Sequence, residues 1–378
     1  MTGFTEALFP CTRIWAVTVH TQDEESQPRL APLQKAAKRR SGVKELLSPW
    51  EEFRRVIPLV SLQSLIGHPH PAVPKVAVLL CTKQGQHFLA EQLNSIATQS
   101  HPSWEIWASD DGSDDHTRAI LEYYQSHWGE DRISIHAGPE EGSTANFLAL
   151  SCRVDIDADY FAYADQDDVW ESDKLERAVE WLRSIPPEVP ALYGSRTLLV
   201  DARNQHIGYS PLFEREPDFR NALVQSIAGG NTMVFNRAAR DLLRQAGENV
   251  KAVTHDWWAY MLVTGCGGVV HYDPYPTVRY RQHGGNQYGS NISLRAHLLR
   301  AKALLQGRFR GWVDSNIGAL QGVRHLMTPE NQRVLDEFVS ARRRWLGARL
   351  AGLRRTGIFR QTRLGNMGLL AAALINRL

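Results

Sequence analysis

The sequence predicts an α/β fold with a mixed, mainly parallel sheet flanked by helices. From residue 75 onward, short apolar runs alternate with segments whose apolar residues recur every three or four positions. That alternation is typical of strand–helix–strand units, which build parallel sheets. Two of the apolar runs end in clusters of Asp residues, and ligands of open α/β sheets bind beyond the carboxyl ends of the strands. We therefore expect both clusters to meet in one crevice.

The expected elements follow one another along the chain. The first strand, 76–80, is an unbroken apolar run, which suits a strand buried on both faces. The first helix, 87–99, carries Phe88, Leu89 and Leu93 at helical spacing. The other elements are expected as strands at 104–108, 133–136 and 160–164 and as helices at 117–128, 146–152 and 174–183.

Three parts are expected along the chain. Residues 1–74 form an N-terminal extension of unknown role, which ends in the linker-like stretch HPHPAVP. Residues 75–300 carry the α/β fold, and residues 301–378 form a helical, Arg-rich C-terminal region.

The composition and charge of the chain argue against several classes of protein. The net charge is only +2, which gives no case for nucleic-acid binding by the chain as a whole. The four Cys residues lie far apart and form no C-x-x-C pair, so neither a zinc site nor a disulfide framework is indicated. We see no apolar run of about 18 residues and no secretory signal at the N-terminus, and we expect a cytoplasmic protein.

The last part of the chain is strongly basic. Residues 341–378 contain nine Arg and no Lys, Asp or Glu, with Trp345, Leu346 and Leu350 among the apolar residues between them. Such a segment can lie on an anionic membrane surface, where each Arg contributes on the order of 1 kcal/mol. The alternative is a solvated helix packed against its own domain. Both interpretations stay open, and the first predicts a peripheral contact with the cytoplasmic face of the membrane.

A second concentration of charge follows the predicted strand 160–164. The stretch YADQDDVW places Asp165, Asp167 and Asp168 together. A helix cap uses one carboxylate, and two carboxylates close together repel each other. A hard divalent cation removes that repulsion, because Mg²⁺ or Mn²⁺ prefers oxygen ligands and commonly takes one or two carboxylates plus substrate phosphates. We therefore expect Mn²⁺ or Mg²⁺ here, bridging the protein and a diphosphate.

Five motifs stand in a fixed order along the chain. They are VAVLLCTKQGQHFLAEQLNSIATQSHPSWEIWASDDGSDDHT, YADQDDVWESDKLERA, GGNTMVFNRAA, HDWW and YRQHGGNQYG. Together they resemble family 2 glycosyltransferases of the GT-A fold, and within them most resemble bacterial rhamnosyltransferase-type enzymes that build surface polysaccharide. The resemblance covers roughly residues 73–300 and implies that the sheet is a GT-A (Rossmann-like) sheet.

The resemblance implies a role for each acidic cluster. Thr82 and Asp111 would contact the nucleotide base, with Asp110 beside them. Asp165 and Asp167 match the family's D-x-D motif. Asp167 would bind the metal, and Asp165 would bind either the ribose or the metal through a water molecule.

Two later motifs would complete the reaction centre. Asp256 in HDWW matches the family's general base, and a carboxylate that removes the acceptor proton contributes roughly 100- to 10,000-fold to the rate. The alternative is that Asp256 only caps the helix that follows it. His283 in RQHGGN matches a histidine that completes the metal or diphosphate site, and Arg281 would assist in binding the donor.

The acceptor pocket is expected to include Gly230, Asn231 and Trp257, although a tight turn and a core aromatic would explain the same residues. One departure from the family concerns the first loop. The family usually has a Tyr-Asn pair after the Thr of that loop, and here Lys83-Gln84 stands instead. The choice between a uridine and a thymidine donor is therefore left open.

The resemblance implies an inverting, metal-dependent glycosyltransferase. It would move a sugar, with rhamnose as one candidate, from a dTDP- or UDP-linked donor to a hydroxyl of a glycan or lipid-linked acceptor in surface polysaccharide synthesis. Two alternatives compete with it: a nucleotide-sugar hydrolase or nucleotidyltransferase that uses the same crevice, and a catalytically silent carbohydrate-binding scaffold. The intact set of candidate catalytic carboxylates argues against the silent scaffold.

Overall fold

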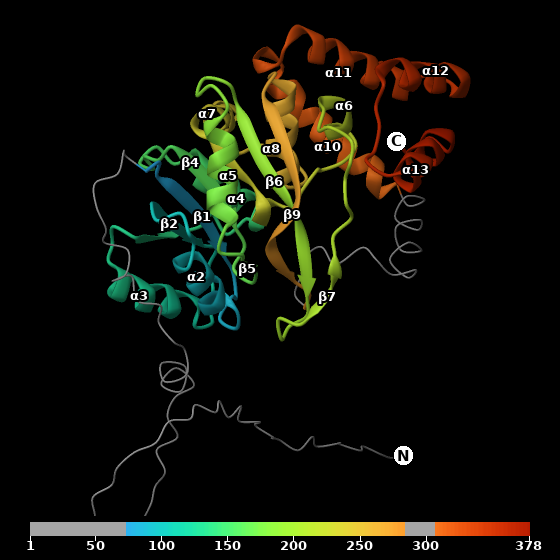
Figure 1. Cartoon of the computed structure of the whole chain (residues 1–378). Coiled ribbons are helices and arrows are strands. Elements are labelled where there is room, and N and C mark those ends of the chain that lie inside the picture. Colours follow the sequence, from blue (N-terminus) through green and yellow to red (C-terminus); the bar gives the residue numbers. More distant parts are fainter. Residues whose placement is uncertain (1–72, 284–306) are drawn as a thin grey trace, which may run out of the picture. The chain divides into compact units, whose positions relative to one another are not determined.

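The computed structural model describes residues 73–283 and 307–378, all within one compact unit. The predicted extension 1–74 lies almost wholly outside the described residues, as does the end of the predicted 75–300 part. In the described ranges, nine strands form one mixed sheet with the order β3-β2-β1-β4-β8-β6-β9-β5, and β7 pairs with β6 (Figure 1). The strands are β1 (Val76–Thr82), β2 (Trp104–Asp110), β3 (Ile133–Ala137), β4 (Tyr160–Ala164), β5 (Val169–Trp170), β6 (Ala191–Val200), β7 (His206–Tyr209), β8 (Val234–Asn236) and β9 (Val269–Arg281).

Helices cover both faces of the sheet. They are α2 (Leu89–Ala97), α3 (Thr117–Trp128), α4 (Ser143–Cys152), α5 (Lys174–Arg183), α6 (Phe219–Ala222), α7 (Arg237–Ala246), α8 (His255–Gly265), α10 (Arg308–Gly322), α11 (Pro329–Arg342), α12 (Leu346–Thr356) and α13 (Arg363–Leu374). All eight elements predicted between residues 76 and 183 are present, within a few residues of their expected ends.

Strand β1 divides the core into two layers, because successive side chains of a strand point to opposite faces. Val76 and Val78 pack in the layer that includes α2, α3 and α5. Ala77 and Leu79 pack in the layer that includes α4, α7 and α8. Every residue of β1 is buried, as the unbroken apolar run predicts for a central parallel strand.

The register of the parallel strands places three loops at one edge of the sheet. Thr82 at the end of β1 is opposite Asp110 at the end of β2, and Leu80 is opposite Ala164 at the end of β4. The loops that follow these strands therefore meet, which confirms the prediction that the two acidic clusters share one crevice. Most paired residues lie in parallel pairs, with β8 antiparallel between β4 and β6.

Strand β9 brings the end of the described α/β region back to this edge. It runs parallel to β6 over the whole length of β6, with two irregularities in the register. Near its end, Val278 and Arg279 pair with the short strand β5, which follows the second acidic cluster directly. Residues 281–283 therefore lie beside the loop 165–168.

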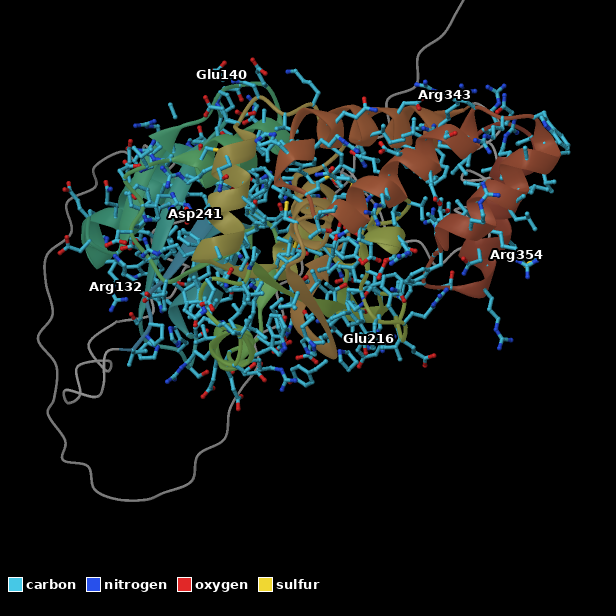
Figure 2. All side chains as sticks on the ribbon, turned by 90° about the horizontal axis from the view of Figure 1, so that it is seen from above. Arg132, Glu140, Glu216, Asp241, Arg343 and Arg354 are labelled. Atoms are coloured by element: carbon cyan, nitrogen blue, oxygen red, sulfur yellow. The ribbon has the colours of Figure 1, made fainter. Side chains whose placement is uncertain are left out.

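The C-terminal helices α10 to α13 pack on the layer that contains α8. Phe338 of α11, Leu353 of α12 and Ala372 of α13 belong to the same apolar cluster as Trp258. Figure 2 shows Arg343 and Arg354 on the outside of this helical group. None of the helices described in residues 73–283 and 307–378 has both the length and the apolar character needed to cross a membrane.

Candidate active site

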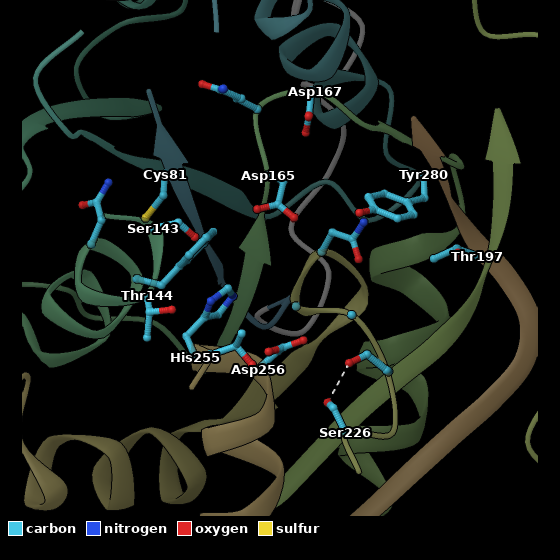
Figure 3. A pocket seen from close by; sticks show the side chains of 18 of the residues that line it. Cys81, Ser143, Thr144, Asp165, Asp167, Thr197, Ser226, His255, Asp256 and Tyr280 are labelled. Carbon is cyan, nitrogen blue, oxygen red and sulfur yellow. Dashed lines mark hydrogen bonds between the residues drawn. The ribbon is translucent and has the colours of Figure 1, made fainter. Parts of the chain in front are cut away.

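A pocket of about 790 Å³ lies at the edge where β1, β2 and β4 end. Figure 3 shows Asp165 and Asp256 in its middle, with Ser143 toward one side and Thr197 and Tyr280 toward the other. We call the first side, formed by β1 and the loops after β2 and β3, the β1 end. The opposite side, formed by β6, β9 and residues 210–213, is called the β6 end.

Of the three residues predicted at or beside the nucleotide base, two line the β1 end, and the third, Asp110, supports them. Thr82 and Asp111 are both lining residues. The Thr82 hydroxyl donates to Asp110 at 2.7 Å, and Asp110 also accepts from Ser113 N–H at 3.0 Å. Asp110 therefore holds the two loops together from behind the pocket.

The carboxylate of Asp111 is held by the loop after β3. Its Oδ1 accepts from Glu140 N–H at 2.7 Å, and its Oδ2 accepts from Gly142 N–H at 3.0 Å. A Cβ on Gly138 would lie 2.8 Å from Asp111 Oδ1, so the loop approaches closely only because residue 138 is glycine. Backbone donors thus fix the orientation of a carboxylate that faces the pocket.

Gln166, between the two aspartates of the D-x-D motif, connects the loops after β1 and β4. Its side-chain oxygen accepts from Lys83 N–H at 2.8 Å, and its side-chain nitrogen donates to Lys83 C=O at 2.7 Å. A Cβ on Gly85 would lie 2.2 Å from the Gln166 oxygen, so a larger residue here would displace the Gln166 side chain from this position. The Lys83 ammonium donates to the backbone oxygens of Asp111 and Gly112 at 2.6 and 2.7 Å. These bonds make one assembly of the three loops.

The carboxylates in the middle of the pocket repel one another. Burial, followed by the charges of Asp167 and Asp256, raises the pKa of Asp165. Asp168 is fully buried, and burial, followed by the charges of Asp167 and Asp165, raises its pKa. Asp168 accepts from Asn231 Nδ2 at 2.5 Å and from Arg281 N–H at 3.1 Å. Asp168 therefore anchors the loop, while Asp165 and Asp167 line the pocket.

The residues that follow β9 reach Asp167. His283 Nε2 lies 2.6 Å from Asp167 Oδ2. Arg281 has a different placement from the expected one, because its side chain is 1% exposed and does not line the pocket. Its Nε donates to Asp167 C=O at 2.8 Å, and its Nη1 donates to Ala202 C=O at 3.2 Å. Arg281 supports the acidic loop from behind.

Helix α8 presents Asp256 to the pocket from its first turn. The N-cap of this helix is Thr254, and Asp256 Oδ1 accepts from Trp257 N–H at 2.7 Å. The preceding His255 stacks on Phe147 with ring centroids 3.9 Å apart, and burial lowers its pKa to about 4. The imidazole beside Asp256 is therefore neutral near pH 7.

The predicted acceptor residues divide into two groups. Gly230 and Asn231 line the pocket. A Cβ on Gly230 would lie 2.3 Å from His255 Nε2, so only glycine fits there. Trp257 is not brought to the pocket: its side chain is buried in the core, where Nε1 donates to Ala222 C=O at 2.6 Å.

The β6 end is lined by neutral side chains. Phe213 and Tyr272 stand with ring centroids 5.5 Å apart, and burial raises the pKa of Tyr272 to about 12. The residues at this end are Ser195, Thr197, Leu199, Ser210, Pro211, Phe213, Tyr272 and Tyr280. Aromatic faces beside hydroxyl groups suit the apolar and polar parts of a sugar ring.

The chemistry of the donor set fits a divalent cation completed by its substrate. In the described residues, no group of three or more His, Cys, Asp or Glu side chains is placed to hold a metal ion by itself. Asp167 and His283 provide one carboxylate and one imidazole, and Mg²⁺ commonly takes few protein ligands plus substrate phosphates. The raised pKa of Asp165 also indicates a place where positive charge would be stabilising.

Fold and site together define an α/β enzyme with a carboxylate-lined pocket beyond the ends of parallel strands. Residues 77–243 match the family described as Glycosyl transferase family 2. Over 253 residues the chain is 30% identical to dTDP-rhamnosyl transferase RfbG of Shigella flexneri, which covers 64% of this chain and 84% of that relative. The chain belongs to the family 2 glycosyltransferases, and its sheet is of the GT-A type, as the sequence predicts.

More distant similarities are found to a second named relative and to a solved structure. UDP-Glc:alpha-D-GlcNAc-diphosphoundecaprenol beta-1,3-glucosyltransferase WfgD of Escherichia coli is 22% identical over 125 residues, which are 33% of this chain and 46% of that relative. The crystal structure of S. aureus TarS 1-349 is 15% identical, covers 75% of this chain and 89% of its own, and has a TM-score of 0.45.

Sequence reasoning missed two parts of the pocket. Gln166 was passed over, although its place between two aspartates puts it in the same loop. The neutral residues of the β6 end carry no motif, since Ser, Thr and Tyr on a strand are common on any sheet. Only the pairing of β6 with β9 brings Thr197 and Tyr280 to the pocket.

Proposed function

We propose that this glycosyltransferase transfers a sugar from a nucleoside-diphosphate donor to a hydroxyl of a glycan or lipid-linked acceptor, with inversion at the anomeric carbon and with the help of a divalent cation. The division of the pocket carries this proposal. The β1 end and the middle contain its charged side chains, and the β6 end is neutral. A nucleotide diphosphate together with its divalent cation suits the first, because most of these side chains are carboxylates, and an uncharged sugar suits the second.

The donor would be held at the β1 end by the loops after the first strands. Thr82 and Asp111 would contact the base, and Asp165 would contact the ribose or, through a water molecule, the metal. The name of the relative RfbG specifies a dTDP-rhamnosyl donor, which supports a dTDP-linked sugar such as rhamnose, with UDP as the alternative nucleotide.

Asp167 and His283 would hold the cation. When bound, Mn²⁺ or Mg²⁺ supplies positive charge that stabilises the departing diphosphate. Arg281 would act through the backbone of Asp167, to which its guanidinium donates at 2.8 Å. Its buried bonds keep the loop 165–168 in one position while the charge on the diphosphate develops.

Asp256 would be the general base. As the bond forms between the acceptor oxygen and the anomeric carbon, the bond from that carbon to the diphosphate oxygen breaks, and the hydroxyl proton passes to the carboxylate of Asp256. Figure 3 shows Asp256 between the two ends of the pocket. Attack from the side opposite the diphosphate gives inversion in a single displacement.

The acceptor would lie at the β6 end with Gly230 and Asn231 at its border. The names of RfbG and WfgD, a dTDP-rhamnosyl transferase and a transferase acting on a diphosphoundecaprenol-linked sugar, support a role in surface polysaccharide synthesis. A lipid-linked acceptor would bring the enzyme to the cytoplasmic face of the membrane. A hydrolase, by contrast, has no use for an extended neutral subsite beside the base.

Calorimetric titration with UDP, dTDP and GDP, each with Mn²⁺ and again with EDTA, tests the proposal. We expect one nucleotide to bind in the presence of Mn²⁺ and to bind far more weakly in EDTA. Absence of binding in both conditions would overturn the donor site. Incubation with the matching nucleotide-sugar in the absence of acceptor is the second arm, and release of free sugar there would favour the hydrolase.

A further inference from the structure

We infer that helices α12 and α13 form a membrane-docking face for an anionic lipid bilayer. The inference deepens the proposed function, since a lipid-linked acceptor lies at such a surface. It also stands on separate observations, because the face is far along the chain from the residues of the pocket.

Helix α13 is apolar on two opposite sides. One side carries Leu369, Ala372 and Ala373, which are at most 8% exposed and belong to the core. The other side is exposed, at 53% to 66% for its central residues, and consists of Leu364, Met367, Leu370 and Leu374. These four recur every three or four positions, so they form one stripe along the helix. An exposed apolar stripe of this length marks an interaction site more often than a solvated surface.

The start of α12, which is close to the last turn of α13, adds a large exposed aromatic residue. Trp345 is 75% exposed and Leu346 is 45% exposed. The buried Arg349 connects the two helices, because its Nη1 donates to Ala373 C=O at 2.8 Å and its Nη2 donates to Arg344 C=O at 3.0 Å. Arg344, which directly precedes Trp345, is therefore held close to the last turn of α13. Trp side chains favour the boundary between lipid headgroups and acyl chains.

The charged side chains that α12 and α13 themselves carry are all basic. Arg343, Arg344, Arg354, Arg355 and Arg363 are exposed, and residues 341–378 contain no Asp or Glu. Figure 2 shows Arg343 and Arg354 on the outside of the helical group. Anionic lipid headgroups complement this charge, whereas a second copy of the same face would be repelled by it.

Apolar and basic residues are both needed for this mode of binding. Shallow insertion of the stripe gives affinity for any bilayer, and Arg near the surface adds affinity for anionic headgroups. The two contributions can be separated by lipid composition and by salt, because only the electrostatic one is screened.

Vesicle sedimentation with the full chain, without donor or acceptor, tests the inference. The probes are vesicles of phosphatidylcholine alone and vesicles that also contain phosphatidylglycerol. We expect at least roughly tenfold stronger partition onto the anionic vesicles, and a decrease as salt rises. Equal partition onto both vesicles, or none onto either at low salt, would overturn the inference.

Matched variants locate the face. The triple variant Leu364→Ser, Met367→Ser and Leu370→Ser should reduce partition roughly tenfold, because the inserted surface is lost. The control variant Val154→Ser with Ile207→Ser changes two exposed apolar residues of the α/β region, 80% and 52% exposed, and should bind as the wild type does. A triple variant that binds as strongly as this control would contradict the assignment.

Nucleotide titration of the same variants keeps the two proposals distinct. Both variants should bind donor nucleotide as the wild type does, since neither touches the pocket. Failure of vesicle binding with normal nucleotide binding rejects only the membrane-docking face. Recovery of the triple variant as a monomer, while the wild type forms a dimer on size-exclusion chromatography, would instead identify a second copy as the occupant and reject the bilayer.

Discussion

At the scale of single residues, the pair His255 and Asp256 joins the core to the reaction centre. His255 packs between Phe147 and the backbone of Gly230, and this places the first turn of α8 against the pocket wall. The neighbouring Asp256 is thereby presented to the pocket from a fixed helix start. Rigid support of this kind is what a general base needs to remain within reach of its proton.

Replacing Asp256 with Asn should abolish transfer and preserve donor binding. The amide keeps the size of the side chain but cannot take the hydroxyl proton, so we expect a loss of roughly 100- to 10,000-fold in turnover. Initial rates and calorimetric nucleotide affinity, measured on the same preparation, check this. A variant with wild-type turnover would remove Asp256 from the mechanism.

His255 should make stability depend on pH. Burial lowers its pKa to about 4, against about 6.5 for an exposed histidine, while the charge of Asp256 acts in the opposite direction. Between these values the unfolded chain binds the proton and the folded chain does not, so the free energy of unfolding falls as pH drops through this window. The loss from this residue is at most about 3 kcal/mol.

Urea unfolding of the wild type and the His255→Gln variant, from about pH 7 to about pH 4, isolates this contribution. Other groups titrate in both proteins, so only the difference between the two curves is informative. We expect the advantage of the wild type to shrink toward acid pH. A difference that stays constant across the range would show that His255 does not titrate in this way.

At the scale of elements, the loops after β1, β2 and β4 behave as one unit because of Gln166 and Lys83. Each of the two bonds between Gln166 and the Lys83 backbone contributes on the order of 1 kcal/mol. The bonds connect the loop that would read the nucleotide base to the loop that would hold the metal. Order in one loop therefore supports order in the other.

The Gln166→Ala variant should bind nucleotide roughly tenfold more weakly, because two hydrogen bonds that order the first loop are lost. Gln205→Ala is the matched control: Gln205 is exposed, and its side chain donates only to the nearby Arg203 C=O at 3.4 Å. Calorimetric titration compares them. Equal affinities for the two variants would mean that the loop is ordered without Gln166.

The elements also show where prediction from the sequence stops. Strand β4 was placed from its apolar run, and α5 from its helical spacing, since both signals are local. Strand β9 was not foreseen because it contains Pro274, Pro276 and three charged residues, and β5 has only two residues. β9 is a strand because it pairs with β6, and β5 is a strand because it pairs with β9. No local sequence pattern reveals such pairing.

The same limit applies to the site. Thr82, Asp111, Asp165, Asp167 and Asp256 line the pocket, as motif order suggests. Motif order does not tell which side of a loop a side chain faces. Arg281 and Trp257, in the same motifs as His283 and Asp256, turn instead into the core, where their polar groups find backbone carbonyl partners.

At the scale of the whole molecule, the C-terminal helices are part of the core. Leu353, Leu369 and Ala372 are buried in the cluster that contains α8, and Asn221 Nδ2 donates to Phe359 C=O at 3.0 Å. The region is therefore not a detachable tail, even though its outer surface has the composition of a docking face.

Truncation after residue 340 should destabilise the protein. It uncovers Phe338, which is fully buried, and removes buried apolar residues that each contribute about 1.5–3 kcal/mol when large. We expect a lower thermal midpoint or aggregation. The Met367→Ser variant, changed only at a 66% exposed position, should melt as the wild type does. Equal melting of the truncated chain and the wild type would contradict this view of the core.

The division of the pocket into a β1 end and a β6 end has a consequence for how the specificity of such an enzyme can change. Residues 76–170 supply most of the β1 end. Residues 191–281 supply the β6 end and also include Asp256. Each is a continuous piece of the chain, so a single recombination event can exchange the β6 end, provided that the incoming piece keeps the contacts of Arg281 and His283 with Asp167. Under the proposed function, a cell could acquire a new glycan linkage in this way while it keeps the sugar nucleotide that its metabolism already makes.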